Sequence, residues 1–108
     1  MCLGDETTMI IIAGILKIEP GDMPKVREAA ENVLRATHKE DGCIVYSFAE
    51  DFLEPGLIRI YEEWESREKL AAHIKSDHVD AWHEALKTVT VLARDLDVIE
   101  AGASEKLG

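Results

Sequence analysis

The sequence lacks most of the features that mark secreted, membrane-bound or nucleic-acid-binding proteins. Its two cysteines, Cys2 and Cys43, form no CxxC pair, which fits a reducing cytoplasm. No stretch approaches the roughly 20 apolar residues of a membrane span, and the first residues lack the basic start and long apolar segment of a secretory signal. Basic side chains are scarce as well. Twelve Lys and Arg against 22 Asp and Glu give a formal net charge of −10, which repels phosphate backbones and anionic headgroups. We therefore expect a cytoplasmic protein that binds neither nucleic acid nor membrane.

Common catalytic motifs are also missing. The sequence contains no GxSxG, no P-loop and no GxGxxG, and Cys43 has no histidine within its own predicted strand. Hydrolase, kinase and dinucleotide-dependent functions are therefore set aside. The 108 residues fit one domain. We assign residues 1–8 to an N-terminal extension, 9–100 to an α+β domain and 101–108 to a C-terminal tail.

Hydrophobic periodicity predicts four strands and two helical regions. Alternating or β-branched runs indicate strands at 9–18, 43–49, 57–64 and 89–99. Apolar residues at three- and four-residue spacing indicate an amphipathic helix that Asp22 caps and that ends near Gly42. Ser66 caps a second helical region, which is interrupted at Ser76-Asp77 and resumes to about Thr88.

The order βαββαβ predicts an α+β, ferredoxin-like domain, in which helices cover one face of a four-stranded antiparallel sheet. The strands carry apolar or aromatic residues on both faces. In the second strand Ile44, Tyr46 and Phe48 are expected on one face, and in the third strand Arg59 and Tyr61 lie opposite Trp64. The uncovered face therefore needs a partner, and we expect an isologous homodimer, with Arg59 pairing with an acidic group across the interface.

Several short motifs stand out over residues 9–99: Asp41-Gly42-Cys43 leading into Tyr46, Tyr61-Glu62-Glu63-Trp64-Glu65-Ser66, Ala72-His73 and Ser76-Asp77-His78. Together they resemble the antibiotic-biosynthesis monooxygenase family, and in particular its quinol monooxygenase-like members. The resemblance implies a dimeric α+β barrel that uses no flavin, haem or metal cofactor. It also implies a small aromatic substrate whose phenolic group is deprotonated, whose anion reduces dioxygen by one electron, and whose radical recombines within a water-excluding pocket.

The resemblance also supplies candidate site residues. His73 and His78 match the histidines beside the family's helix break, and imidazole is the side chain that titrates unperturbed near neutral pH. Either histidine is a candidate acid or base, although His78 could equally lie in a capping region and His73 could pack beside Trp64. Candidate substrate-binding residues are the aromatic side chains Trp64, Tyr46, Phe48 and Trp82, which are equally suited to a core.

His83 is the third candidate catalytic residue. It shares an apolar stripe with Val79 and Leu86, so we expect it to point toward the sheet and to need a hydrogen-bond partner. Counted from Ser76, it falls where haem-degrading family members place their axial histidine. Those members also carry an asparagine in the first strand, where this sequence has Gly14.

Three functions therefore stay open: a cofactor-independent monooxygenase, a non-catalytic domain that binds a small aromatic ligand, and a haem-degrading enzyme. No metal site is predicted. His73, His78 and His83 recur at five-residue intervals, whereas two ligands on one helical face need a spacing of three or four, and no carboxylate completes the pattern.

Overall fold

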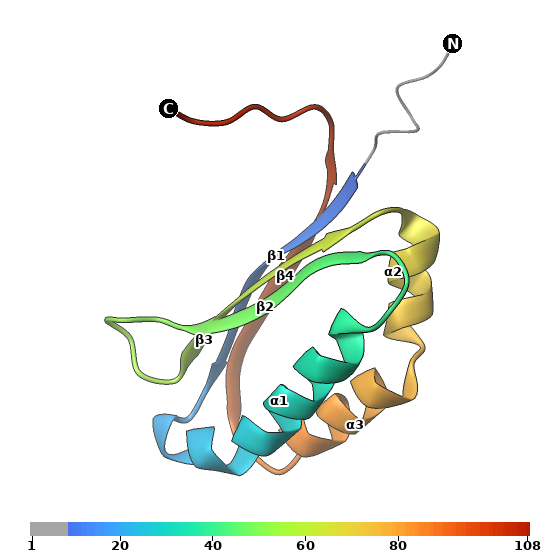
Figure 1. Ribbon diagram of the computed structural model, residues 1–108. Coiled ribbons are helices and arrows are strands. Elements are labelled where there is room, and N and C mark those ends of the chain that lie inside the picture. The colour runs from blue at the N-terminus through green and yellow to red at the C-terminus, as the bar shows by residue number, and fades with distance from the viewer. Residues whose placement is uncertain (1–8) are drawn as a thin grey trace.

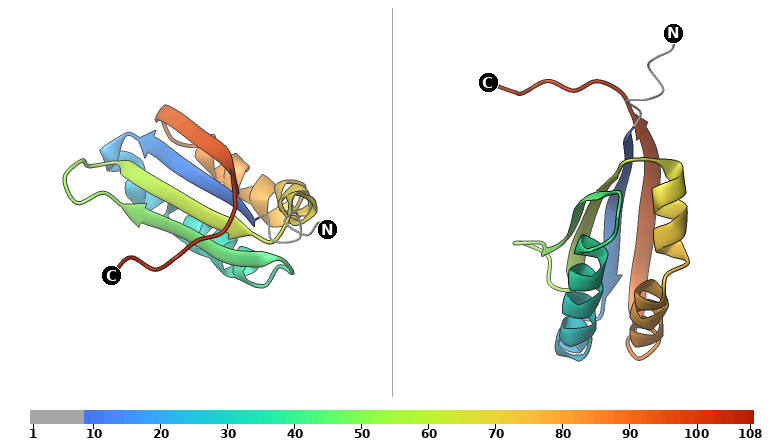
Figure 2. Two further views of the ribbon diagram at one scale, coloured as in Figure 1. Left: turned by 90° about the horizontal axis from the view of Figure 1, so that it is seen from above. Right: turned by 45° about the vertical axis from the view of Figure 1, so that its right-hand side comes forward.

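The computed structural model describes residues 9–108, so the predicted N-terminal extension (residues 1–8) and Cys2 lie outside the described residues. The four strands form one antiparallel sheet in the order β2-β3-β1-β4. The helices gather on one face of this sheet, and the chain after β4 runs away from the domain (Figures 1 and 2). The predicted ferredoxin-like α+β fold is confirmed. Its elements are β1 (Met9–Ile18), α1 (Met23–His38), β2 (Cys43–Glu50), β3 (Leu57–Trp64), α2 (Arg67–Ile74), α3 (Asp77–Leu86) and β4 (Val91–Ala101).

Helix ends differ in part from the prediction. Ser66 caps α2 as expected, and Ser76, at the predicted break, caps α3. Their side chains accept hydrogen bonds from the backbone N–H groups of Lys69 and Val79. Asp22 does not cap α1, because its carboxylate instead accepts a 2.9 Å hydrogen bond from the N–H of Thr90. Among residues 9–108, no helix has the length and apolarity needed to cross a membrane.

The predicted alternation of β2 is wrong at its first apolar residue. The register between β2 and β3 shifts between Cys43 and Val45, so Ile44 is an extra residue without a partner on β3. Such a bulge interrupts the alternation of faces along the strand. Ile44 is therefore 50% exposed, whereas Tyr46 is buried under the helices.

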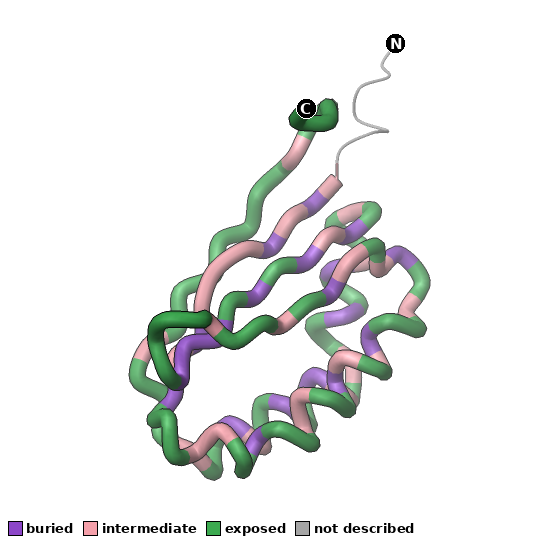
Figure 3. The backbone as a smooth tube through the Cα atoms, turned by 60° about the vertical axis from the view of Figure 1, so that its left-hand side comes forward, coloured by how far each residue is buried: buried purple, intermediate pink, exposed green. Residues whose placement is uncertain are grey.

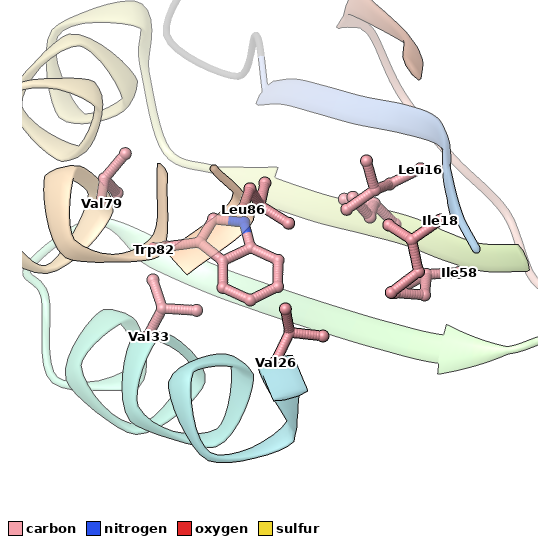
Figure 4. Close-up of a cluster of buried hydrophobic side chains, with 9 residues drawn as sticks. Leu16, Ile18, Val26, Val33, Ile58, Val79, Trp82 and Leu86 are labelled. Carbon is pink, nitrogen blue, oxygen red and sulfur yellow. The ribbon is translucent and has the colours of Figure 1, made fainter. Parts of the chain in front are cut away.

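The core lies between the helices and the sheet, and Trp82 of α3 is at its centre (Figure 4). The indole packs among aliphatic side chains from both layers, which include Val26 and Val33 of α1 and Ile58 of β3. A second cluster, comprising Ile10, Ile12, Tyr46, Trp64 and Leu70, fills the end of the sheet beneath α2. This second cluster forms the floor of the site described below.

Strand β4 is an edge strand that lies very close to β1. A Cβ atom on Gly14 would lie 1.9 Å from the carbonyl oxygen of Asp95, so only glycine allows the two backbones to approach this closely. Most of β4 is exposed despite its apolar composition (Figure 3). Leu92, Leu96, Val98 and Ile99 each expose 40–51% of their surface.

Candidate functional site

A cavity of about 230 Å³ lies between the sheet and the helices α2 and α3. Its wall is mainly aliphatic and aromatic, as expected for a site that binds a small apolar or aromatic molecule. The titratable side chains on this wall, apart from Tyr46, are Glu62, His73 and His83. A smaller hollow of about 120 Å³ between α1 and β2 has none of the histidines on its wall. The larger cavity is lined by Ile12, Tyr46, Phe48, Ile60, Glu62, Leu70, His73, Ile74, Val79, Trp82, His83, Leu96 and Val98.

His73 is the buried histidine of this cavity, with 4% of its surface exposed. Its ring lies between two aromatic side chains, with centroid distances of 5.1 Å to Tyr46 and 4.6 Å to Trp64. Its Nδ1 donates a 2.7 Å hydrogen bond to Oε2 of Glu40. Burial lowers the pKa of His73, and the neighbouring carboxylate of Glu40 partly opposes this shift. The ring is therefore neutral at pH 7, and Nε2 is free to accept a proton from a ligand in the cavity.

Glu40 accepts the hydrogen bond from Nδ1 of His73, and the sequence analysis did not identify it as a site residue. It lies just after α1, where its N–H donates to the carbonyl of Thr37 at 2.9 Å. Gly42, with a φ of 91°, then turns the chain into β2. Oε2 of Glu40 accepts a second hydrogen bond, at 2.5 Å, from Nε2 of His78. Glu40 directly precedes the Asp41-Gly42-Cys43 motif, and this position was the signal that could have pointed to it.

The break between α2 and α3 brings the two histidines to the same carboxylate. In one continuous helix, residues five apart point about 140° away from each other. Here Ser76 ends the first helical segment by donating to the carbonyl of His73 at 2.6 Å, and it caps the next by accepting from the N–H of Val79. His78 therefore lies in the first turn of a redirected helix, with its ring centroid 6.0 Å from that of His73.

Glu62 is a second carboxylate that the sequence analysis did not identify as a site residue. It is 7% exposed, it lines the cavity, and it accepts a 2.9 Å hydrogen bond from Nε1 of Trp64. Burial raises the pKa of Glu62, and the Trp64 hydrogen bond partly opposes the shift. Burial likewise raises the pKa of Tyr46, its neighbour on β2, so that this phenol stays protonated.

The aromatic candidates occupy different places. Tyr46, Phe48 and Trp82 line the cavity. Trp64 has no exposed surface and is not part of the wall; it contacts the site indirectly, through Glu62 and His73. His38, the remaining histidine, donates a 2.8 Å hydrogen bond from Nε2 to the backbone carbonyl of Tyr46.

The expectation that His83 points inward with a hydrogen-bond partner is wrong. The side chain is exposed at the rim of the cavity, because the neighbouring Trp82 takes the inward position on α3. Gly14, the position of the asparagine in haem-degrading members, has no room for a side chain beside Asp95. Arg59 pairs at 3.0 Å with Asp51 of the same chain; its expected pairing across an interface stays a prediction.

The fold and the histidine site together define a small ferredoxin-like protein with a cavity between sheet and helices. A model of the antibiotic biosynthesis monooxygenase family matches residues 9–85. The chain belongs to this family, as its motifs predicted.

Individual relatives agree with this assignment. An uncharacterized protein of Synechocystis is 27% identical over 89 residues, which cover 82% of this chain; the chain spans about three-fifths (59%) of the length of that relative. A solved structure from Deinococcus radiodurans, provisionally named an antibiotic biosynthesis monooxygenase, is 28% identical with a TM-score of 0.75 over 92% of this chain and 96% of its own. A conserved protein of Methanosarcina mazei shares the fold, with 21% identity and a TM-score of 0.76 over 89% of this chain and 94% of its own.

Proposed function

We propose that this protein is a cofactor-independent monooxygenase that oxidises a small aromatic quinol or phenol with dioxygen. One observation carries the proposal: His73 lies on the wall of an apolar cavity, and its Nδ1 is held by Glu40. A neutral imidazole with one nitrogen fixed by a carboxylate is a typical general base. The proposal places the enzyme in the reducing cytoplasm expected from the sequence.

The geometry suggests a role for each polar group. Nε2 of His73 accepts the phenolic proton, and Glu40 orients the ring and stabilises the imidazolium that forms. The anion then passes one electron to dioxygen, and the two radicals combine in the cavity. One oxygen atom enters a C–O bond, the other leaves as water, and the substrate supplies all four electrons, so no external reductant is needed.

The rest of the cavity supports binding of a planar ring. Phe48 and Trp82 lie with centroids 5.5 Å apart on one side of the wall, and aromatic side chains favour contacts with a flat apolar molecule. The protonated Tyr46 and the buried Glu62 are the polar groups that can orient the substrate's second oxygen. The exposed position of His83 and the lack of space at Gly14 argue against haem as the ligand.

We also propose that the protein acts as a homodimer. β4 is a long edge strand with several exposed apolar side chains, and such strands usually pair with or pack against another chain. On the sheet face without helices, Ile99 lies opposite the half-buried Ile11, which gives an apolar patch for sheet-to-sheet packing. Leu96 and Val98 line the cavity, so a partner over β4 would also help to exclude water.

Oxygen consumption is the direct test. The protein, freed of metal by a chelator, is assayed in an oxygen electrode with a panel of dihydroxynaphthalenes, anthrones and hydroquinones. Turnover of one of these substrates, lost in His73→Ala, supports the proposal. Saturable binding of panel compounds without oxygen uptake would replace it with a ligand-binding function, and a Soret shift on haem titration would favour the haem alternative.

A further inference from the structure

We infer that Glu40, His73 and His78 form a binding site for a divalent transition-metal ion such as zinc. The three side chains come from the turn after α1, from α2 and from the first turn of α3. One ligand atom from each lies within 4.8 Å of the other two. The donor set, two imidazole nitrogens and one carboxylate oxygen, is one that zinc and neighbouring transition metals prefer.

The present distances describe a hydrogen-bonded cluster that can open around an ion. Oε2 of Glu40 lies 2.7 Å from Nδ1 of His73 and 2.5 Å from Nε2 of His78. Tetrahedral zinc with bonds of 2.0–2.1 Å places its ligand atoms about 3.3 Å apart. Each of these nitrogen–oxygen distances would therefore need to lengthen by less than about 1 Å, which a rotation of the Glu40 side chain provides. The two N–H protons of the cluster would shift to the opposite ring nitrogens.

The cluster is both anchored and accessible. The ring of His73 is fixed between Tyr46 and Trp64, and its side chain is only 5% exposed. The side chain of His78 is 26% exposed and that of Glu40 is 17% exposed, so an ion and a completing water molecule can enter from solvent on that side. Hard cations such as magnesium are disfavoured, because two of the three donors are imidazoles.

The ion would lie outside the cavity, on the Nδ1 side of His73. Of the three ligands, only His73 belongs to the cavity wall, and it would bind the ion through Nδ1, the nitrogen that now faces Glu40. An imidazole ligated at Nδ1 carries its proton on Nε2 and cannot accept another. Metal binding would thus convert Nε2 from an acceptor into a donor. This consequence, though not the binding itself, rests on the proposed function: zinc would inhibit the oxygenase by removing its base.

The binding is tested directly, without an assay of activity. The chelator-treated full chain is titrated with zinc in competition with a chromophoric zinc indicator, and with cobalt, whose visible spectrum reports coordination by nitrogen ligands. We expect one zinc per chain. Glu40→Gln and His78→Ala should each weaken zinc binding by about 100-fold or more. His83→Ala is the matched control, because it removes a histidine of α3 outside the cluster, and its zinc affinity should equal that of the wild type.

Two results would overturn the inference: no zinc bound at millimolar concentration by a chain shown to be folded by circular dichroism, or equal affinity in the wild type and His78→Ala. The inhibitory consequence is tested separately, by measuring oxygen uptake with and without zinc. If no substrate is turned over, the proposed function fails while the zinc titration still decides the metal site. Uptake that is unaffected by bound zinc would refute the inhibition alone.

Discussion

Glu40 and His73 are 33 positions apart in the sequence, yet the Glu40 carboxylate lies 2.7 Å from Nδ1 of the His73 ring. This contact joins the turn after α1 to the last turn of α2, where the His73 ring also packs against Tyr46 of β2. The contact fixes the ring proton of this cavity-lining histidine on Nδ1. The predictions below follow from this pair and from the elements that hold it in place.

Replacing His73 by alanine should lower the rate of oxygen uptake by about 10²- to 10⁴-fold, the usual contribution of a positioned general base. Steady-state oxygen consumption with a turned-over panel substrate provides the measurement. Arg35→Ala, which changes an exposed ion pair on the far side of α1, is the control and should keep wild-type activity. A His73→Ala enzyme that remains fully active would rule out this histidine as the base.

Glu40→Gln should keep an acceptor for Nδ1 of His73 but remove the negative charge. Because that charge opposes the lowering of the His73 pKa by burial, its removal should lower this pKa further. The acid limb of the activity profile, where the base becomes protonated, should move to lower pH, and the maximal rate should fall by about tenfold or more as imidazolium stabilisation is lost. The pH–rate profiles of both enzymes, measured with a chelator present, check this. An unchanged profile would reduce Glu40 to a structural residue.

Glu62→Gln should stabilise the protein at neutral pH. Burial raises the pKa of Glu62 above its ordinary value of 4.5, so its contribution to stability is fully present below pH 4.5 and is lost as the pH rises through the folded-state pKa. Glutamine can still accept from Nε1 of Trp64 without carrying a charge. The midpoint of thermal unfolding should exceed that of the wild type at pH 7.5, and the difference should vanish near pH 4.

The exposed Glu65 provides the control for this comparison, because Glu65→Gln should change stability by no more than about 0.5 kcal/mol at either pH. A Glu62→Gln protein that is less stable than the wild type at pH 7.5 would contradict the argument from desolvation.

Gly14→Ala should destabilise the fold by about 1–3 kcal/mol, the usual cost of overpacking. The new Cβ would meet the carbonyl oxygen of Asp95, which belongs to the backbone of β4 and cannot rotate away. Gly21→Ala is a matched control, because nothing lies within 4 Å of its Cβ position and its φ is not positive. Urea unfolding of the two variants distinguishes them, and equal midpoints would show that β4 can move freely away from β1.

Ile99→Lys should convert the proposed dimer into a monomer, since a buried lysine would lie opposite Ile11 on the packed face. Light scattering after size-exclusion chromatography should give twice the 12.0 kDa chain mass for the wild type and a single chain mass for the variant. Leu107→Lys, at a fully exposed position in the tail, should leave the mass unchanged. A monomeric wild-type protein would disprove the dimer.

The fold was predictable because its signals are local. β-branched runs, two serine caps and a glycine turn each specify their own element, and the order of the elements then leaves one simple topology. The bulge at Ile44 was not predictable, because it arises from pairing with β3 and leaves no mark in the alternation of β2.

The site was predictable only in part, because its contacts are long-range. The motif residues His73 and His78 were identified, but their five-residue spacing was taken to argue against a shared ligand. The break at Ser76 was predicted as well, but its direction, which turns both imidazoles toward Glu40, was not. Glu40 and Glu62 resembled ordinary surface acids among 22 acidic residues. Their positions beside and within the family motifs were a signal, but only the long-range contacts show that one is buried beside Trp64 and the other lies between two imidazoles. His83 was misplaced because the apolar stripe of α3 could have centred on it or on Trp82.

The central position of β1 has a consequence for how the chain folds during synthesis. This strand emerges from the ribosome before the other three, but one of its edges is completed only by β4, and Ile18 pairs with Val91. Until residues 91–101 emerge, a run of isoleucines is left with an open backbone edge on which a neighbouring nascent chain could pair. Pairing between two strands so far apart in the sequence is non-local and slow to form. The yield of native protein should therefore depend on chaperones more than the size of this chain suggests.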